Sequence, residues 1–537
     1  MIFDYVIAGG GSAGCVLARR LTEDPNVSVC LLEAGGGGKD LIIRMMLGGF
    51  FMIQNKPVQI NNWCMDTVPQ PGLNGRKGYQ PRGRALGGSS AINAALYIRG
   101  QRQDYDDWAN LGNEGWDWDS MLPYFKKSEN NQRGGDAEHG ADGPLQVSNQ
   151  QVPREISHAF VDAATHLQHR RTDDFNRGDQ EGVGLYQVTQ FHDKNKNGER
   201  CSAAAGYLFP VMDRPNLKVV TRAAVKRLLM EGKRATGVLY RHKGKDIEVK
   251  ARREVLVCAG ALKSPQILQL SGIGNGEDLA RLGIDVVHDL PGVGQNLQDH
   301  LDFSLSFRTK HKDNLGISAK GGLDIMRHIW RWKKNGKSMA ASPVAEGGAF
   351  LKSAPDLDRP DIQLHFMMTI VDDHLRKLYW GHGYSCHMCK LRPASRGSVF
   401  LQSADPLAMP GIDPAFLSDP RDLETMIKGV KITREIMKAP PLANYELSEM
   451  HGTDQAKTDA DWERHIRDRA DTIYHPVGSC KMGVDEMAVV DPQLRVRGVK
   501  GLRVVDASIM PNLVSGNTNA PTMAIAEKAA DIIRATA

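Results

Sequence analysis

A glycine-rich turn between an apolar strand and a helix constrains this chain more than any other feature of its sequence. Residues 3–8 have the pattern of a buried strand, and Gly9-x-Gly11-x-x-Gly14 follows directly. Residues 15–21 then have helical character, and residues 27–32 form a second apolar run. This order predicts a βαβ unit of a parallel sheet with a doubly wound, Rossmann-like arrangement.

The spacing of the three glycines suits a dinucleotide. The first glycine permits a tight turn, the second lets the backbone approach a pyrophosphate, and the third lets the helix pack on the strand. Glu33 lies 19 residues beyond Gly14, where a carboxylate can accept hydrogen bonds from ribose hydroxyls. The motif alone is weak, and a glycine-rich turn without a ligand is the alternative.

Composition narrows the class of protein. Glycine is enriched, with 55 residues in 537, whereas 41% apolar and 24% charged residues are ordinary for a globular protein. Disordered, collagen-like and coiled-coil classes are therefore excluded. The net charge of +5 is too small for so long a chain to imply a nucleic-acid partner. The length predicts two to four domains.

The cysteines and the apolar runs bear on location. Eight cysteines are scattered along the chain, and no apolar run approaches the length of a membrane span. We therefore expect a cytoplasmic protein without a signal peptide. Cys386 and Cys389 form one CxxC pair in an expected strand, where core packing is favoured over metal or redox chemistry. No metal site is predicted.

Two further stretches rich in glycine and serine, at 82–93 and 260–274, are expected to be turns between a strand and a helix. Solvated turns are the alternative. Together with Gly9 to Gly14 and the C-terminal segments 475–478 and 516–519, they resemble the glucose-methanol-choline (GMC) flavin oxidoreductases almost from end to end. Segments 61–63, 71–76 and 474–476 are most similar to bacterial primary-alcohol and polyethylene glycol dehydrogenases, which are choline dehydrogenase-like enzymes.

The resemblance implies FAD as the cofactor. Its ADP half would lie on Gly9 to Gly14 and Glu33, and its ring system against the loop from Arg84 to Asn93. Some relatives attach FAD covalently through a histidine that precedes this asparagine. Ile92 occupies that position here, so non-covalent FAD is expected. The implied contacts are Gly9, Gly11, Ser12, Ala13, Gly14, Glu33, Ala34, Arg84, Gly87, Gly88, Ser89, Asn93, Val225, Asp506, Ala507, Asn517 and Thr518.

The resemblance also implies the chemistry. Alcohol oxidation by hydride transfer needs a base for the hydroxyl proton and a donor that holds the oxygen as charge develops. By family position His475 is the base and Asn519 its partner, while flavin N5 takes the hydride. His300 is expected to be structural. An alcohol oxidase that uses oxygen, a redox-silent FAD-containing lyase and a flavoprotein kept only for binding are the alternatives.

The expected architecture is α/β plus α+β. Residues 1–155, 200–304 and 471–537 would form a discontinuous FAD-binding domain. Residues 156–199 and 305–470 would form a substrate-binding domain on an antiparallel sheet, with strands at 361–368 and 384–391. Candidate walls of the substrate pocket are Phe366, Met367 and Tyr474.

Two segments bear on the substrate and the partners. The apolar stretch from Leu41 to Ile53 is either core or lid packing, or the wall of an apolar substrate channel. Residues 310–337 carry eight Lys or Arg, which form either a solvated face or a peripheral contact with the anionic inner membrane. The expected partners are a small alcohol and an electron acceptor such as a quinone or a cytochrome.

Overall fold

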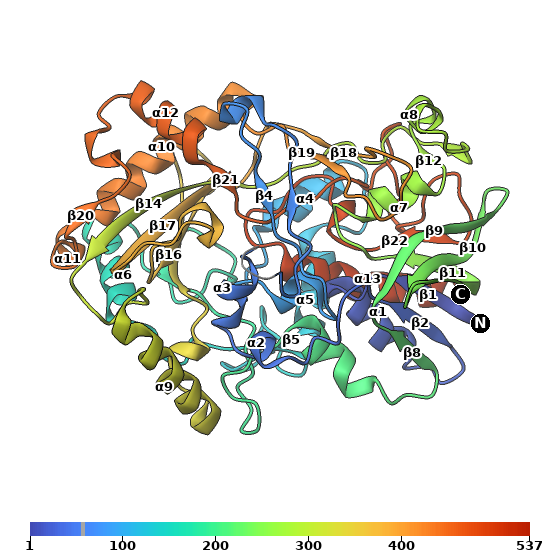
Figure 1. The fold of residues 1–537 in the computed structure, drawn as a ribbon, viewed down its shortest axis with the longest axis horizontal. Helices are drawn as coiled ribbons and strands as arrows, with labels where there is room; N and C mark the ends of the chain where they lie inside the picture. The colour runs from blue at the N-terminus through green and yellow to red at the C-terminus, as the bar shows by residue number, and fades with distance from the viewer. Residues whose placement is uncertain (55–58, 537) are drawn as a thin grey trace.

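The computed structural model describes residues 1–54 and 59–536, and it has two large sheets in two halves (Figure 1). The first sheet has the strand order β8-β2-β1-β11-β10-β9, with β22 paired to β11. Strands β8, β2, β1, β11 and β22 are parallel, and β10 pairs antiparallel with β11 and β9. Their bounds are β1 Ile2–Ala8, β2 Val29–Leu32, β8 Leu217–Val220, β9 Ala223–Glu231, β10 Arg234–His242, β11 Lys245–Val257 and β22 Leu502–Val504.

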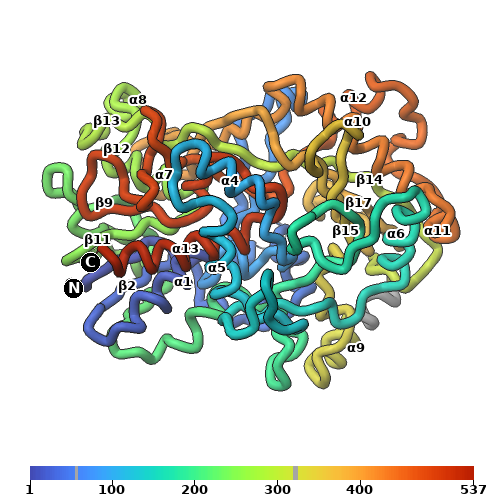
Figure 2. Tube along the Cα trace, turned by 180° about the vertical axis from the view of Figure 1, so that it is seen from behind, coloured from blue at the N-terminus to red at the C-terminus, as the bar shows by residue number. Residues whose placement is uncertain are grey.

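Two helices from opposite ends of the chain pack together against this sheet. Helix α1 (Ser12–Leu21) contacts α13 (Asn519–Ala535), which in turn packs on α5 (Trp118–Ser128). Glu527 is fully buried and pairs with Arg20, whose Nε lies 2.7 Å from a carboxylate oxygen. The C-terminal helix therefore completes the half that the N-terminal strand begins, and both termini lie at the same end of the molecule (Figures 1 and 2).

The second large sheet is antiparallel, with the order β20-β14-β17-β16-β15-β7 and with β21 paired to β14. Helices α6 (Glu155–His166) and α10 (Pro420–Met437) pack on it and share an apolar core with its strands. The strand bounds are β7 Gly182–Leu185, β14 Leu301–Thr309, β15 Ala345–Leu351, β16 Ile362–Met367, β17 His382–Lys390, β20 Ser448–Glu449 and β21 Asp471–Thr472.

Smaller elements connect and cover the two halves. The short strands are β3 Met65–Asp66, β4 Tyr79–Gln80, β5 Glu129–Asn131, β6 Leu145–Val147, β12 Ile273–Gly274, β13 His288–Asp289, β18 Ser398–Phe400 and β19 Gly411–Asp413. The remaining α-helices of the described residues are α2 Leu41–Arg44, α3 Gly48–Met52, α4 Arg102–Asn110, α7 Ser264–Leu270, α8 Gly276–Arg281, α9 Ala319–Asn335, α11 Pro440–Ala443 and α12 Asp459–Arg469.

The expected fold class, a Rossmann-like half with an antiparallel second sheet, is confirmed. Two strands depart from the expected domain limits. Strand β14 runs from residue 301 to residue 309 across the limit at 304, and β21 belongs to the second sheet although residue 471 opens the expected FAD-binding segment. Cys386 and Cys389 are buried free thiols of β17, which confirms core packing for this pair. Across residues 1–54 and 59–536, no helix has the length and apolar character to span a membrane.

Candidate active site

A cavity of about 880 Å³ lies where the two halves meet. From the first half it is lined by Ala8, Leu32 and Cys258, which stand at the carboxyl ends of β1, β2 and β11. From the second half it is lined by residues of β14, β16 and β17. Ligands of parallel α/β sheets bind at the carboxyl ends of the strands, so this cavity is the candidate active site.

The glycines of the N-terminal turn shape one end of the cavity. A Cβ on Gly14 would overlap the carbonyl oxygen of Gly9, whereas a Cβ on Gly11 would have no neighbour closer than 3.9 Å. Gly14 is therefore needed for packing, and Gly11 leaves space for a ligand. Helix α1 begins at Ser12, and no side chain caps it, so its N-H groups are available to a phosphate.

Glu33 stands beside this turn at the end of β2. Its two carboxylate oxygens accept hydrogen bonds from the N-H groups of Gly35, at 2.7 Å, and Gly10, at 3.0 Å. Burial raises the pKa of Glu33 to about 7. The carboxyl group lines the cavity within reach of the same ligand as the α1 terminus, which fits the ribose of a dinucleotide.

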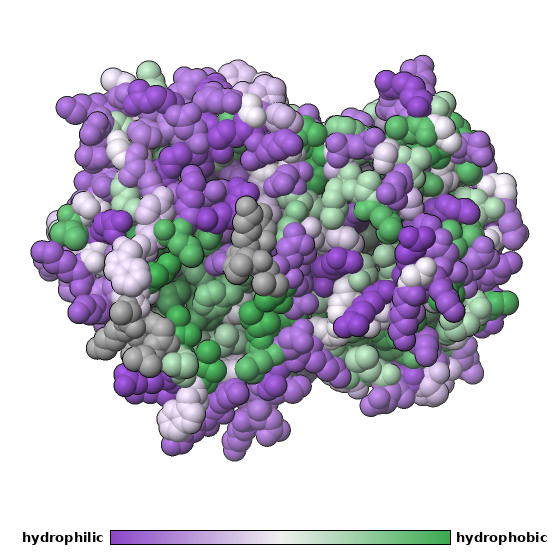
Figure 3. Space-filling model, viewed as in Figure 1, coloured by the Kyte–Doolittle hydropathy of each residue, from purple (hydrophilic) through white to green (hydrophobic). Residues whose placement is uncertain are grey.

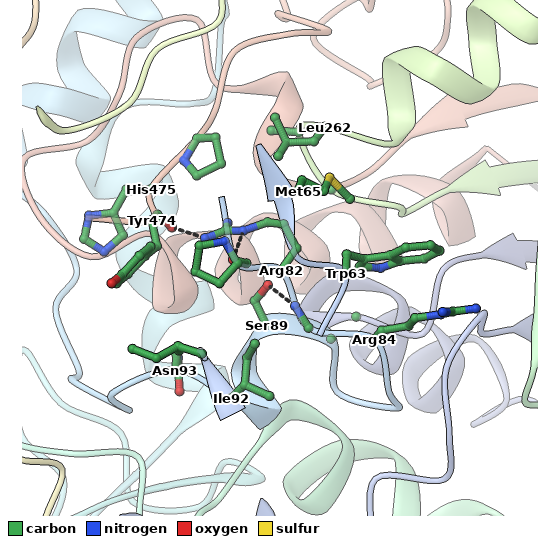
Figure 4. A pocket seen from close by; sticks show the side chains of 18 of the residues that line it. Trp63, Met65, Arg82, Arg84, Ser89, Ile92, Asn93, Leu262, Tyr474 and His475 are labelled. Carbon is green, nitrogen blue, oxygen red and sulfur yellow. Dashed lines mark hydrogen bonds between the residues drawn. The ribbon is translucent and has the colours of Figure 1, made fainter. Parts of the chain in front are cut away.

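The loop from Gly83 to Asn93 forms the floor of the cavity in Figure 4. The N-H group of Gly83 donates to Ser89 Oγ at 3.2 Å, and the loop turns through Gly88 with φ 53°. A Cβ on Gly88 would lie 2.7 Å from Cα of Gly11, so the loop presses against the N-terminal turn. The side of the loop that faces the cavity therefore adjoins the dinucleotide end.

The structure gathers most of the predicted site residues around this cavity. Three of them do not line it: Gly14 and Gly87 support turns, and Phe366 lies in the apolar core, where its ring stacks on Phe160 at 4.7 Å. Phe366 is therefore not a pocket wall, because its strand turns His365 and Met367 to the cavity instead. The predicted residues that do line it are Gly9, Gly11, Ser12, Ala13, Glu33, Ala34, Arg84, Gly88, Ser89, Asn93, Val225, Met367, Tyr474, His475, Asp506, Ala507, Asn517, Thr518 and Asn519.

The neighbour of His475 is Asn517, whose Nδ2 lies 3.1 Å from Nε2 of the imidazole. Asn519 instead accepts a hydrogen bond from Ser12 Oγ at 2.8 Å, at the junction of α13 and α1. This corrects the expected pairing of His475 with Asn519. Both asparagines stand in the same four-residue segment, but Asn517 precedes α13, whereas Asn519 is its first residue and faces α1.

His475 is buried and follows a residue with a strained backbone. Arg82 donates to the carbonyl oxygen of Tyr474 at 2.7 Å, and Tyr474 itself has φ 75° (Figure 4). The N-H group of His475 donates to Asp299 at 2.8 Å. Burial, followed by the neighbouring His300, holds the pKa of His475 well below its usual value. The imidazole is therefore neutral near pH 7 and can accept a proton.

Some residues at the site were not singled out from the sequence. His300 was expected to be structural, yet its Nδ1 lies 3.0 Å from Nδ1 of His475. Asp302 and His387 line the cavity as a pair 2.6 Å apart. Asp302 and His387 belong to two antiparallel strands with no local motif, and only the pairing of β14 with β17 shows that they meet. His300 directly precedes β14, and the pairing of β14 with β21 brings it near His475.

The segment from Leu41 to Ile53 contributes to both structural roles that the sequence left open. Met46, Gly49, Phe50 and Ile53 line the cavity. Other residues of the segment are buried against the protein: Ile43, Met45, Leu47 and Met52. The segment is thus both a packed cover and an apolar wall.

Comparison with known proteins agrees with this geometry. Family models described as GMC oxidoreductase match residues 3–302 and 393–526. The chain belongs to the GMC oxidoreductase family. An alcohol dehydrogenase [acceptor] of Pseudomonas putida is 46% identical over 99% of this chain and 96% of its own. The human mitochondrial choline dehydrogenase is 44% identical over 99% of this chain and 90% of its own.

A solved structure of a pyridoxine 4-oxidase from Mesorbium loti has a TM-score of 0.88 at 32% identity and covers 98% of both chains. The expected family, fold and FAD cofactor are thereby confirmed, and the protein is an oxidoreductase that acts on alcohols. The residues around the α1 turn and the loop from Gly83 to Asn93 fit FAD, since they supply N-H groups, small residues and Glu33 where a pyrophosphate and a ribose need them.

Proposed function

We propose that this GMC oxidoreductase oxidises primary alcohols with an aliphatic or ether chain to aldehydes and passes the electrons to an acceptor other than oxygen. The observation that carries the proposal is the pair of His475 Nε2 and Asn517 Nδ2, 3.1 Å apart on the cavity wall. One atom can accept a proton and the other can donate a hydrogen bond to the same alcohol oxygen.

His475 and Asn517 have separate roles in the proposed reaction. His475 Nε2 removes the hydroxyl proton, and Asn517 Nδ2 donates to the alcohol oxygen while negative charge develops on it. FAD, when bound, accepts the hydride of the carbinol carbon. The alcohol thus loses one proton and one hydride and becomes an aldehyde. Adding a primary alcohol to the holoenzyme without oxygen tests this, since flavin bleaching is expected and a redox-silent lyase would show none.

The substrate preference follows from the wall formed by Met46, Phe50, Ile53 and Val344. These side chains suit an alkyl or ether chain. A sugar bound against them would bury further hydroxyl groups without hydrogen-bond partners, and each such group costs about 1–3 kcal/mol of binding free energy. We therefore expect a higher kcat/KM for a linear primary alkanol than for glucose, and the reverse order would refute this preference.

The electron acceptor is inferred from the relatives. The Pseudomonas putida relative is named for a separate acceptor, whereas the pyridoxine 4-oxidase of similar structure favours an oxidase as the second candidate. We expect the reduced enzyme to be reoxidised quickly by an artificial quinone and slowly by oxygen. Peroxide released at the rate of alcohol turnover would establish the oxidase instead.

We also propose that the outward face of α9 contacts an anionic membrane, where a quinone or a cytochrome would be found. Met326 and Trp330 are 60% and 64% exposed, and Arg331, Lys333 and Lys334 are exposed beside them. The side chains of residues 319–324, which include one cation of this stretch, lie outside the described residues. Sedimentation with anionic vesicles tests the proposal. A variant with Arg331, Lys333 and Lys334 changed to Gln should stay in the supernatant.

Non-covalent FAD is proposed from Ile92, which is buried beside the cavity and offers no nucleophile. Acid precipitation should therefore release yellow FAD into the supernatant. Flavin that stays in the pellet would show a covalent link through another residue.

A further inference from the structure

We propose that His300 is a positioning residue which, together with Tyr186, fixes the tautomer of His475 so that its Nε2 faces the alcohol without a proton. This inference rests on the proposed function, in which His475 is the base. It assigns a role to two buried residues that touch neither the cavity surface nor the alcohol, and it follows from two chains of hydrogen bonds that meet at His475.

The first chain of hydrogen bonds begins at a backbone carbonyl. Nε2 of His300 lies 2.8 Å from the carbonyl oxygen of Leu391, just beyond β17. A carbonyl only accepts, so Nε2 of His300 carries the hydrogen and Nδ1 of the neutral ring carries a lone pair. Nδ1 of His475, at 3.0 Å, must then donate to it. A neutral imidazole has one N-H group, and Nε2 of His475 is therefore left without a proton.

The neutral state that this reasoning needs is imposed by burial. His300 is fully buried, and burial lowers its pKa to about 4. Four charged or titratable groups face the pair: Asp299, which accepts a hydrogen bond from the N-H group of His475, the buried His365, Arg82 and Arg392. The last three disfavour a further positive charge. The two rings meet edge to face at a centroid distance of 5.2 Å.

The second chain of hydrogen bonds, on the Asn517 side of His475, also leaves Nε2 of His475 without a proton. Tyr186 Oη donates to the carbonyl oxygen of Leu364 at 2.6 Å, so it accepts from Nε2 of Gln363 at 3.1 Å. The same Nε2 donates to Oδ1 of Asn517 at 3.1 Å. Asn517 must therefore turn its Nδ2 toward His475, where it finds a lone pair at 3.1 Å. Both chains thus place a lone pair on Nε2.

The first chain orients His475 but does not carry protons away. Its last acceptor is the carbonyl oxygen of Leu391, which has no proton of its own to release. A proton taken from the alcohol therefore leaves His475 through the cavity. Loss of the correct tautomer in a serine protease lowers kcat about 10⁴-fold, which sets the scale expected here.

Two substitutions of His300 distinguish a positioning role from a proton relay. His300→Asn keeps an acceptor near the position of Nδ1, whereas His300→Leu removes it at similar volume. At saturating alcohol, we expect His300→Leu to reduce its flavin about 10² to 10⁴ times more slowly than the wild type and His300→Asn to stay within about tenfold. FAD content and the Kd for alcohol should match in both holoenzymes. Equal slowing of both variants would indicate a proton relay and overturn the proposal, as would no slowing in either.

A substitution of Tyr186 tests the second chain of hydrogen bonds. Tyr186→Phe removes the hydroxyl that orients Gln363, and we expect a roughly tenfold slower flavin reduction, the equivalent of one hydrogen bond. An unchanged rate would remove Tyr186 from the proposal. If His300→Leu does not fold, the rate of Tyr186→Phe and the protonation of the two ring nitrogens of wild-type His475 still test the proposal.

The tautomer of His475 can be determined by NMR without turnover. In holoenzyme labelled with ¹⁵N-histidine, the nitrogen signals of His475 are identified by their loss in His475→Gln. We expect Nδ1 to carry the hydrogen and Nε2 to carry none at pH 7, and the opposite assignment overturns the proposal. The NMR result also separates this proposal from the proposed function. If His475 has the expected tautomer but no alcohol reduces the flavin, only the proposed function is refuted.

Discussion

The chemistry of the site depends on an imidazole that burial keeps neutral and an amide that points at it. Asp299 and Arg82 hold the backbone around His475 from both sides, and Tyr474 adopts a left-handed φ that a non-glycine residue rarely has. Such strain is retained where the surrounding contacts determine the conformation. The sequence could identify the two polar segments that carry these groups, but it could not show which asparagine reaches His475.

The two asparagines give a paired prediction at this scale. Asn517→Ala removes the donor beside His475 and should slow flavin reduction by about 10² to 10³-fold, as loss of an oxyanion donor does. Asn519→Ala removes only the acceptor of Ser12 and should cost much less. Anaerobic stopped-flow reduction of both variants measures this. A larger loss in Asn519→Ala would restore the pairing that the family position suggested.

The pH dependence of flavin reduction is a second prediction for the same residue. Burial lowers the pKa of His475 below its usual 6.5, so the imidazole stays a free base down to lower pH. The rate should therefore be flat through neutral pH and fall only on acidification below 6.5, as protonation removes the base. The limiting rate is measured from pH 5 to 9. A half-maximal rate at or above pH 6.5 would contradict this account.

At the scale of elements, the segment containing α2 and α3 covers the cavity with apolar side chains. Phe50 and Met46 face the cavity, whereas Phe51, the next residue, is exposed. Figure 3 shows apolar (green) side chains gathered on this face of the molecule. Apolar content predicted a covering segment, but a run of mixed Met, Phe and Gly has no period from which the inward side chains could be identified.

Phe50 and Phe51 form a matched pair for testing the apolar wall. Phe50→Ser should raise KM for a long-chain primary alcohol by roughly tenfold or more, since burial of a large apolar side chain contributes about 1.5–3 kcal/mol. It should change KM much less for ethanol, which has only a two-carbon chain to bury. Phe51→Ser should change neither value. Equal effects of the two substitutions would show that the segment does not contact the chain of the substrate.

The N-terminal turn allows a similar comparison. Gly14→Ala would drive a methyl group into the carbonyl oxygen of Gly9, so we expect loss of bound FAD and a stability loss of about 1–3 kcal/mol. Gly37→Ala is the control, because a Cβ there has no neighbour within 4 Å. The FAD content and the Tm of the purified proteins measure both effects. Full FAD occupancy in Gly14→Ala would show that this glycine is not required for packing.

For the whole molecule, the site exists only where two halves meet. The α1 turn, Glu33 and the loop from Gly83 to Asn93 belong to the first half, and their short-range motifs made them predictable. His300 lies beside His475 because β14 pairs with β21, and Gln363 and Tyr186 act on His475 only through Asn517. These contacts depend on an antiparallel sheet assembled from distant segments. Periodicity can predict such strands, but not which residues of neighbouring strands stand side by side.

The most direct measurement is the anaerobic reduction of bound flavin by a linear primary alcohol, compared between the wild type and His475→Ala. A positioned base contributes about 10² to 10⁴-fold, so we expect the variant to be slower by that factor. It should keep its FAD, because the α1 turn and Glu33 are unchanged. If His475→Ala reduces its flavin at nearly the wild-type rate across the pH range, His475 is not the base and the account of this site is wrong.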